Sequence, residues 1–237
     1  MATALVFTGG DPPPFGLAAH LPPSRPGTAP DLPSSDLLVI AADSGLEHAH
    51  ALGYRVEVVI GDLDSVDPRA LDAAVAAGAT VEAHPREKDA TDLELALDAV
   101  IARRIERGIT RLTVVGGGGG RLDHHLANLL VMASERCAAL TLDAWLAPAH
   151  VMVVRDQVEL QARVGALCSL LPVHGPAIGV TTSGLRYALD ESTLAPGSTR
   201  GVSNELLDST ARVTLRSGTL LVILPDGLSD SAPNPHI

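Results

Sequence analysis

The stretch VEVVIGDLDSVDPRALDAAVAAGATVEA, residues 56–83, decides the fold because it carries a complete βαβ unit. The apolar run at 56–60 predicts a buried strand, the Ala- and Leu-rich run at 68–77 predicts a helix, and 80–83 predicts a second strand. Short strands that alternate with helices are typical of α/β domains built around a parallel sheet. This segment therefore predicts a mostly parallel sheet covered by helices.

The same alternation extends in both directions, from residue 4 to about residue 145. Further strands are predicted at 4–8, 37–41, 112–115 and 139–142, and further helices at 44–52, 91–107 and 121–135. The segment 11–33 holds eight of the 17 prolines and is predicted to be a loop insert.

Three helix starts have explicit capping signals. Ser44 with Glu47, and Thr91 with Glu94, have the spacing of a capping box. Asp67 before Pro68 predicts an N-cap followed by proline at the first helical position. One apolar face is predicted for the helix at 91–107, formed by Leu93, Leu97, Val100, Ile101 and Ile105.

After residue 150 the helical pattern stops and short strand-like runs follow, separated by Gly, Pro and Ser. They lie at 151–154, 157–162, 166–173, 177–181, 212–215 and 219–224. We therefore predict two domains: a Rossmann-like α/β domain with a mostly parallel sheet over residues 1–150, and a smaller C-terminal all-β sandwich over 151–237.

Composition excludes several classes of function. The 237 residues are 46% hydrophobic, which is enough for one large domain or two small ones with cores of their own. The 17 basic and 28 acidic side chains give a net charge of −11, and only five residues are aromatic, so nucleic-acid binding is disfavoured. Cys137 and Cys168 lack metal-ligand spacing, and no apolar run is long enough to span a membrane. We expect a cytoplasmic protein without a membrane partner.

The motif GDLDS at 61–65 directly follows a predicted strand, so Asp62 and Asp64 leave the carboxyl end of the sheet. Open α/β sheets bind ligands at that edge. Two close carboxylates repel each other, and a hard cation such as Mg²⁺, which often accompanies phosphate, relieves the repulsion. The alternative is an Asp-rich turn that only caps the next helix. Asp43, in AADSG, also follows a predicted strand and has the same two interpretations.

The motif EKDATDLE at 87–94 contains Lys88, the only lysine among 17 basic residues. An ammonium suits a phosphate oxygen, and Asp92 in the first helical turn would complete a metal site beside free backbone N–H groups. The alternative is simple helix capping by Thr91 and Asp92.

The motif VVGGGGGRLDHH at 114–125 predicts a strand, a glycine-rich turn and a helix, which brings backbone N–H groups to phosphate oxygens. It lacks the Lys-Ser/Thr of a P-loop, and Arg121 stands where a dinucleotide fingerprint needs its third glycine. Arg121 can clamp a phosphate, while Asp123 and His124 can orient a substrate or accept a proton. A surface Arg–Asp pair would have the same sequence. Residues and spacing thus favour a magnesium- and phosphate-dependent α/β enzyme.

Taken in order, AADSG, GDLDS, EKDATDLELAL and GGGGGRLDHHLANLL resemble the thiamine pyrophosphokinase (thiamin diphosphokinase) family. The segment GVTTSGLRYALDESTLAPGSTRGVSNEL at 179–206 resembles the thiamine-binding β domain of that family. The resemblance implies a transferase, a kinase of thiamine diphosphate biosynthesis, that moves the diphosphoryl group of ATP to the hydroxyl of thiamine with Mg²⁺ and releases AMP. It also implies a homodimer with the active site at the subunit interface.

Site residues follow from the matching motifs. Magnesium would be held by Asp62, Asp64 and Asp92, and thiamine by Ser203 and Asn204. The implied ATP site comprises Asp43, Lys88, Thr91, Gly117, Gly118, Gly119 and Arg121. The implied catalytic set is Asp62, Asp64, Lys88, Asp92, Arg121 and Asp123, in which Asp123 or a metal-bound Asp accepts the alcohol proton. Two alternatives stay open: an inactive regulator that binds the nucleotide or thiamine diphosphate, and a magnesium-dependent phosphotransferase for another alcohol.

Overall fold

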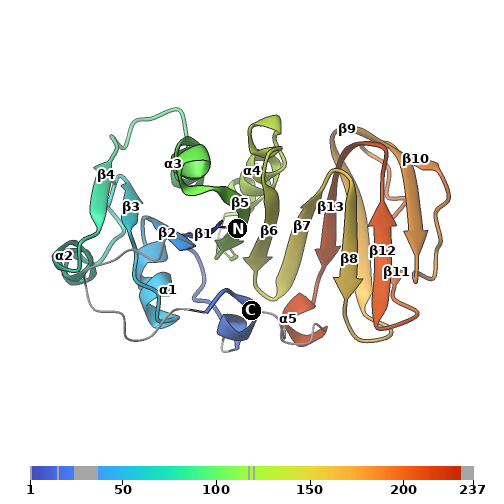
Figure 1. The fold of residues 1–237 in the computed structure, drawn as a ribbon, viewed down its shortest axis with the longest axis horizontal. Coiled ribbons are helices and arrows are strands. Elements are labelled where there is room, and N and C mark those ends of the chain that lie inside the picture. The colour runs from blue at the N-terminus through green and yellow to red at the C-terminus, as the bar shows by residue number, and fades with distance from the viewer. Residues whose placement is uncertain (1, 15, 24–36, 117, 120, 231–237) are drawn as a thin grey trace. The chain divides into compact units, whose positions relative to one another are not determined.

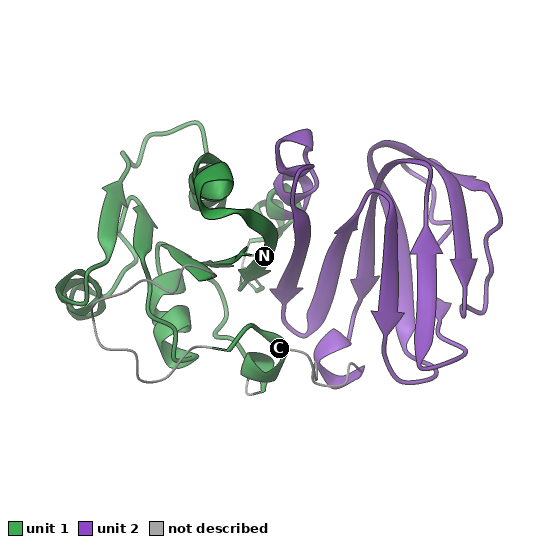
Figure 2. Ribbon diagram, viewed as in Figure 1, with its two compact units in different colours: residues 1–128, 237 green, residues 129–236 purple. Residues whose placement is uncertain are grey.

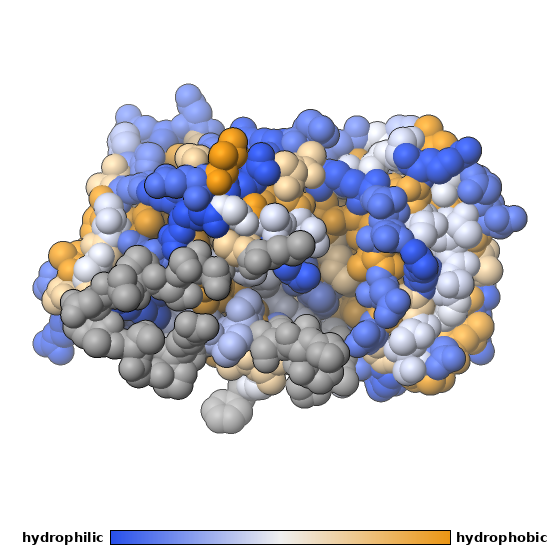
Figure 3. Space-filling model, in the orientation of Figure 1, coloured by the Kyte–Doolittle hydropathy of each residue, from blue (hydrophilic) through white to orange (hydrophobic). Residues whose placement is uncertain are grey.

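The computed structural model describes residues 2–14, 16–23, 37–116, 118–119 and 121–230. These residues form two compact units that divide between Asn128 and Leu129 (Figure 2). The sequence predicted a division at residue 150. The structure divides earlier because the strands at 141–146 and 149–154 pair antiparallel with each other, and the second of them pairs with a strand near the C-terminus. On the face shown in Figure 3, hydrophilic residues cover much of the described surface, with hydrophobic residues scattered among them.

The first unit is an α/β sheet, as predicted. Its strands are β1 (Ala2–Phe7), β2 (Leu37–Ala42), β3 (Val58–Gly61), β4 (Thr80–Ala83) and β5 (Ile109–Val115). Its helices are α1 (Gly45–Ala51), α2 (Pro68–Ala76), α3 (Asp92–Arg107) and α4 (Leu122–Met132), of which α4 continues past the division. A short 3₁₀ helix, Leu17–His20, lies in the proline-rich segment, of which residues 15 and 24–33 fall outside the described part.

The five strands run parallel in the order β4-β3-β2-β1-β5. The chain moves from β1 outward to β4 and then returns to the other side of β1, so the order reverses between β1 and β5. Helices α1 and α3 pack on the strands from opposite sides (Figure 1), which explains why β1 is almost wholly apolar and buried. Doubly wound sheets bind ligands at the carboxyl ends of the strands, at this reversal point.

Two of the three predicted caps are confirmed. Thr91 Oγ1 accepts a hydrogen bond from Glu94 N at 3.2 Å, and Asp67 Oδ1 accepts one from Arg69 N at 2.7 Å. The Ser44 cap was wrong: Ser44 has helical dihedrals, φ −62° and ψ 0°, and makes no side-chain cap bond. An N-cap side chain needs an extended backbone to reach the next turn. Glu47 instead accepts a hydrogen bond from Asp67 N at 2.6 Å.

The predicted apolar face of α3 is correct at its start and wrong at its end. Leu93, Leu97 and Val100 are buried, whereas Ile101 is half-buried and Ile105 is 84% exposed. Residues four apart drift about 40° around a helix, because four residues exceed one turn of 3.6. The spacing from 97 through 101 to 105 therefore turns progressively away from the sheet.

The second unit is antiparallel and strand-rich. Its strands are β6 (Thr141–Leu146), β7 (Ala149–Val154), β8 (Gln157–Gln161), β9 (Leu167–Ser183), β10 (Ser192–Leu194), β11 (Asn204–Glu205), β12 (Thr210–Thr214) and β13 (Ser217–Leu224). They pair in the order β6-β7-β13-β9-β12-β8, with β10 and β11 also on β9. A short helix α5 (Gly227–Asp230) and the 3₁₀ turn Glu135–Cys137 complete the unit.

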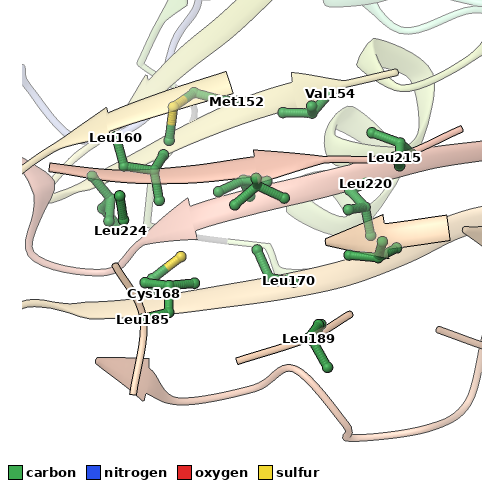
Figure 4. Close-up of a cluster of buried hydrophobic side chains, with 14 of the residues drawn as sticks. Met152, Val154, Leu160, Cys168, Leu170, Leu185, Leu189, Leu215, Leu220 and Leu224 are labelled. Carbon is green, nitrogen blue, oxygen red and sulfur yellow. The ribbon is translucent and has the colours of Figure 1, made fainter. Parts of the chain in front are cut away.

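The core of this unit consists of side chains that alternate inward from facing strands. Met152 and Val154 from β7, Leu160 from β8 and Leu170 from β9 pack into one apolar cluster (Figure 4).

The two strands predicted at 166–173 and 177–181 are one strand, β9. His174 and Gly175 both have positive φ, 60° and 148°, so they mark an irregular turn of the backbone within the strand. Along the described residues, no helix combines the length and apolar character needed to cross a bilayer.

Candidate active site

The loops that follow β1 and β5 meet at the reversal point of the sheet. Thr8 N donates to Val115 O at 2.9 Å, and Asp11 N donates to Gly118 O at 3.0 Å. Gly116 has φ 102°, and a Cβ there would overlap Thr8 O. The glycines thus let two turns approach more closely than side chains would permit. Of the predicted ATP-binding glycines, Gly118 and Gly119 are described and Gly117 is not.

The predicted carboxylates converge around Gly61, the last residue of β3. Gly61 has φ 141°, and a Cβ there would overlap Asp43 Oδ1 and lie 3.1 Å from Asp92 Oδ1. Asp43 Oδ1 accepts a hydrogen bond from Leu63 N at 3.1 Å, and Asp62 Oδ1 accepts one from Asp64 N at 3.1 Å. The turn after β3 is therefore held by the same carboxylates that the sequence assigned to the site.

Lys88 is the cation of this carboxylate cluster. Its Nζ lies 2.8 Å from Asp92 Oδ1 and 3.7 Å from Asp62 Oδ2, and its side chain is only 13% exposed. Asp92 occupies the first position of α3, directly after the N-cap Thr91. The capping explanation is thus correct for Thr91 but does not account for the ion pairs of Lys88.

The pKa values of three groups in this cluster are shifted, two of them upward and one downward. Burial, followed by the adjacent Asp92 carboxyl, raises the pKa of Asp43 from 3.8 to about 7. The hydrogen bond from Asp64 N, assisted by Lys88, lowers the pKa of Asp62. Burial alone would lower the pKa of Lys88, but its contacts with Asp92, Asp62 and Asp43 raise it. Lys88 therefore remains an ammonium at neutral pH.

An open cleft of about 770 Å³ lies over this edge of the sheet. Most predicted residues of the α/β site line it, namely Asp43, Asp62, Lys88, Thr91, Asp92, Gly119 and Arg121. The turn after β1, represented in the lining by Thr8, Gly9 and Gly10, was not predicted from the sequence. Two glycines directly after a buried strand were the available signal. Further lining residues are Ser44, Ser65, Arg86, Asp89, His124, His125 and Asn128.

Two predicted residues form exposed ion pairs and do not line the cleft. Asp64 Oδ2 lies 3.5 Å from the Arg86 guanidinium. Asp123 accepts hydrogen bonds from Arg121 Nε at 3.2 Å and from Arg121 Nη2 at 2.6 Å. This pairing lowers the pKa of Asp123 to about 2, which makes Asp123 a weak base.

The three carboxylates predicted to hold a metal do not share one partner. Among the described residues, no three His, Cys, Asp or Glu side chains form a preassembled metal site. Asp62 and Asp92 lie together on Lys88, while Asp64 turns to Arg86. Asp92 Oδ1 is shielded from solvent and has no hydrogen-bond partner among the described residues. Lys88 Nζ lies 2.8 Å away and forms an ion pair with it. This oxygen can accept a further cation.

The predicted thiamine residues lie in the second unit. Ser203 is exposed, has φ 57°, and its backbone N donates to Ser169 Oγ at 3.1 Å. Asn204 is 2% exposed. Its amide is bound to the backbone of its neighbours, with bonds of 2.9 Å to Tyr187 N, Tyr187 O and Glu205 N.

Two models of known protein families match this chain. A family model described as thiamin pyrophosphokinase, catalytic domain, matches residues 30–142. A second, described as thiamin pyrophosphokinase, vitamin B1 binding domain, matches residues 155–220, so together they cover well over half of the chain. The chain belongs to the thiamin pyrophosphokinase family. This confirms the family predicted from the four motifs.

Individual thiamine pyrophosphokinases are distant relatives. Thiamine pyrophosphokinase 1 of Oryza sativa subsp. japonica is 26% identical over 182 residues, which cover 72% of this chain and 66%, just under two thirds, of the relative. Thiamine pyrophosphokinase of Bacillus subtilis is 25% identical over 78% of this chain and 86% of its own length.

Solved structures in the family share the fold. The crystal structure of thiamine pyrophosphokinase from Bacillus subtilis superposes with a TM-score of 0.76 at 22% identity, covering 94% of this chain and 98% of the other. Yeast thiamin pyrophosphokinase gives a TM-score of 0.68 at 15% identity, covering 96% and 88%. The parallel sheet followed by an antiparallel, strand-rich region is therefore the fold of this family.

Proposed function

We propose that this protein is a thiamine diphosphokinase: it transfers the diphosphoryl group of ATP to the hydroxyl of thiamine and forms thiamine diphosphate and AMP. The observation that carries the proposal is the clustering of Asp43, Asp62, Asp92 and Lys88 at the carboxyl ends of β2 and β3, in a chain that matches both family models. A cleft with several acidic oxygens and one buried ammonium suits a metal-bound polyphosphate.

Magnesium fits the residues present. Carboxylate oxygens are its preferred protein ligands, and it is usually held by one or two carboxylates together with substrate phosphates. This explains why no three-residue site is preassembled in the described part of the chain. Asp62 and Asp92 would hold the ion, with Asp64 as a further oxygen donor. When bound, the ion neutralises charge on the phosphate oxygens.

The residues of the cleft would then act mainly by positioning and by charge. Lys88, with its pKa raised, supplies a point charge to the β- and γ-phosphate oxygens. The first turn of α3, which begins after the Thr91 cap, places a helix N-terminus, the end that favours an anion, beside the cleft. Gly119 permits close approach of the nucleotide. Arg121 exchanges Asp123 for a phosphate, because an ion pair that is exposed to water contributes little to stability.

In this reaction the thiamine oxygen attacks the β-phosphorus, the bond from that phosphorus to the α–β bridging oxygen breaks, and AMP leaves. The alcohol proton has to pass to a base. We propose that the acceptor is either Asp123, once Arg121 has exchanged it for a phosphate, or a carboxylate that holds the cation.

We also propose roles for the two parts of the chain, an oligomeric state and a cellular location. We propose that the ATP- and magnesium-binding function lies within residues 1–150 and that the thiamine-binding β sandwich, with Ser203, lies within residues 151–237. We also propose a homodimer that completes the active site at the subunit interface. Neither cysteine forms a disulfide and both are buried, which is compatible with action in the reducing cytoplasm.

Product analysis tests the proposal. Purified protein is incubated with ATP, Mg²⁺ and thiamine, with thiamine omitted from the control, and nucleotides are separated by chromatography. Thiamine-dependent AMP supports the proposal. Formation of ADP instead would indicate a monophosphate-transferring kinase, and binding without turnover would indicate an inactive regulator.

A further inference from the structure

Two neighbouring loops at the carboxyl edge of the parallel sheet face each other with opposite charges. They follow β3 and β4, whose carboxyl ends are paired in the sheet. The first loop carries Asp62 and Asp64, and the second carries Arg86 and Lys88. Lys88 Nζ lies 3.7 Å from Asp62 Oδ2, and Arg86 Nη1 lies 3.5 Å from Asp64 Oδ2. The loops are therefore joined by an inner ion pair, Lys88 with Asp62, and an outer ion pair, Arg86 with Asp64.

The inner and the outer ion pair differ in burial and in their number of contacts. The side chains of the inner pair are 13% and 15% exposed, and Lys88 also contacts Asp92 at 2.8 Å. In the outer pair Arg86 is 82% exposed and Asp64 is 49% exposed, and a single contact joins them. An ion pair that is exposed to water contributes little to stability. Arg86 can therefore leave Asp64 at low cost, whereas Lys88 stays in place.

Arg86 is also the least committed of the Lys and Arg side chains that line the described part of the cleft. Lys88 contacts two carboxylates, and Arg121 makes two hydrogen bonds to Asp123, at 3.2 and 2.6 Å. Four Asp side chains but only three Lys and Arg side chains contribute to that lining, so a polyphosphate that enters the cleft needs a cation released toward it. A guanidinium meets this need, because its planar geometry allows two parallel hydrogen bonds to phosphate oxygens.

We propose that Arg86 is a phosphate-binding residue that pairs with Asp64 in the free protein and exchanges it for the terminal phosphate of ATP when a divalent cation takes the Asp64 carboxylate. This inference rests on the proposed function, which gives Arg86 no role. A cation that approaches Asp64 weakens the outer ion pair, because like charges repel each other. Lys88 serves the β- and γ-phosphate oxygens in the proposed function, and Arg86 lies on the same loop at a more exposed position, so we assign the end of the triphosphate to Arg86.

Nucleotide binding measured by calorimetry, with Mg²⁺ and without thiamine, tests the phosphate contact. Arg86→Ala is expected to raise the Kd of ATP about tenfold, the loss typical of one charge-assisted hydrogen bond, and to leave the Kd of AMP within twofold of the wild type. Arg86→Lys retains the charge without the paired geometry, and its ATP Kd is expected to fall between the two. Arg111→Ala is the matched control, because Arg111 is exposed on β5 and does not line the cleft; both Kd values should match the wild type.

Binding of Mn²⁺ alone, measured by electron paramagnetic resonance without nucleotide, tests the exchange at Asp64. Arg86→Ala is expected to bind Mn²⁺ about twofold to fivefold more tightly than the wild type, because the ion no longer competes with the guanidinium for the carboxylate. Asp64→Asn is expected to bind Mn²⁺ more weakly, and Arg86→Ala should have no further effect in the Asp64→Asn background. A variant that merely loosens the loop would weaken the binding of both ligands.

Three results would overturn the inference. An ATP Kd within twofold of the wild type in Arg86→Ala would exclude the phosphate contact. Equal weakening of ATP and AMP would exclude the assignment to the terminal phosphate. Tighter Mn²⁺ binding that persists in the Asp64→Asn background would show that Arg86 acts by general repulsion and not through Asp64.

The proposed function fails separately from this inference, because the binding measurements use no thiamine. The expected shifts in Kd, in a protein that forms no thiamine-dependent AMP, would support the role of Arg86 and refute the reaction. An unchanged ATP Kd in Arg86→Ala, with thiamine-dependent AMP formed by the wild type, would refute the role of Arg86 and support the reaction.

Discussion

Substituting Gly61 by alanine tests whether the carboxylates packed around it form the reaction site. Gly61 has φ 141°, a conformation that costs an L-residue about 1–3 kcal/mol. The new Cβ would overlap Asp43 Oδ1 and lie 3.1 Å from Asp92 Oδ1. Because these atoms are ends of side chains, they turn aside without a large additional cost in stability. The displaced carboxylates are expected to lower kcat/KM about 100-fold, the loss typical of misplacing reacting groups by about 1 Å.

Gly108→Ala is the matched control. Gly108 is the C-cap residue of α3 with φ 64°, and a Cβ added there would have no described atom within 4 Å beyond its chain neighbours and its own helix. Gly108→Ala should lower the unfolding free energy, measured in urea, by a similar amount of about 1–2 kcal/mol. Its kcat/KM should stay within twofold of the wild type. If Gly61→Ala loses stability like the control but keeps its kcat/KM within threefold, the carboxylates at Gly61 are not the reaction site.

Three further predictions concern the same cleft. Asp62→Asn should lower turnover at least about 100-fold, the size of losing one preorganised electrostatic group, with an unchanged melting curve, whereas Asp72→Asn on the exposed side of α2 should retain activity. Lys88→Met should raise the ATP KM roughly tenfold or more, since a charge-assisted bond is worth about 1.5–3 kcal/mol; an unchanged KM would exclude a phosphate contact. With a chelator present, the unfolding free energy should fall between pH 4 and pH 7, because Asp43 ionises near 3.8 when unfolded but only near 7 when folded. Asp43→Asn should reduce that fall by up to about 4 kcal/mol, and by less where solvent screens the charge. If urea unfolding shows the same fall with pH in the wild type and in Asp43→Asn, the pKa shift is contradicted.

The parallel sheet could be predicted because its signals are local. Buried strands read as short apolar runs, and Asp67–Pro68 and the Thr91 box mark helix starts by spacing alone. The Ser44 box has the same spacing and failed, since its backbone dihedrals depend on how α1 meets β1, where a Cβ on Gly45 would overlap Phe7 O. Spacing does not contain that tertiary constraint.

Most of the α/β site could be predicted because its residues lie in the segments that connect the strands to the following helices. Asp43 and Asp62 come from adjacent strands β2 and β3, so their proximity follows from parallel pairing. The turn at Thr8 was missed because its place in the cleft depends on β1 lying beside β5, and strand order is not visible in a single sequence. The partners of Asp64 and Asp123 depend likewise on the directions of exposed Arg side chains.

The strand-rich region was predicted less completely. Strands β10 and β11 have three and two residues, too short for an alternation pattern. The family motif implied that Asn204 contacts thiamine, but a motif does not show which way an amide points. Only the fold places that amide on the backbone of Tyr187.

The most direct test of the central claim uses ATP labelled with ³²P at the β-phosphorus. Protein, labelled ATP, Mg²⁺ and thiamine are incubated together, and radioactivity is counted in separated thiamine diphosphate, AMP and ADP. Transfer of a diphosphoryl group in one step predicts that the label enters thiamine diphosphate in amounts equal to the AMP released. Two successive transfers of the γ-phosphate would leave the label in ADP, and that result would contradict the account.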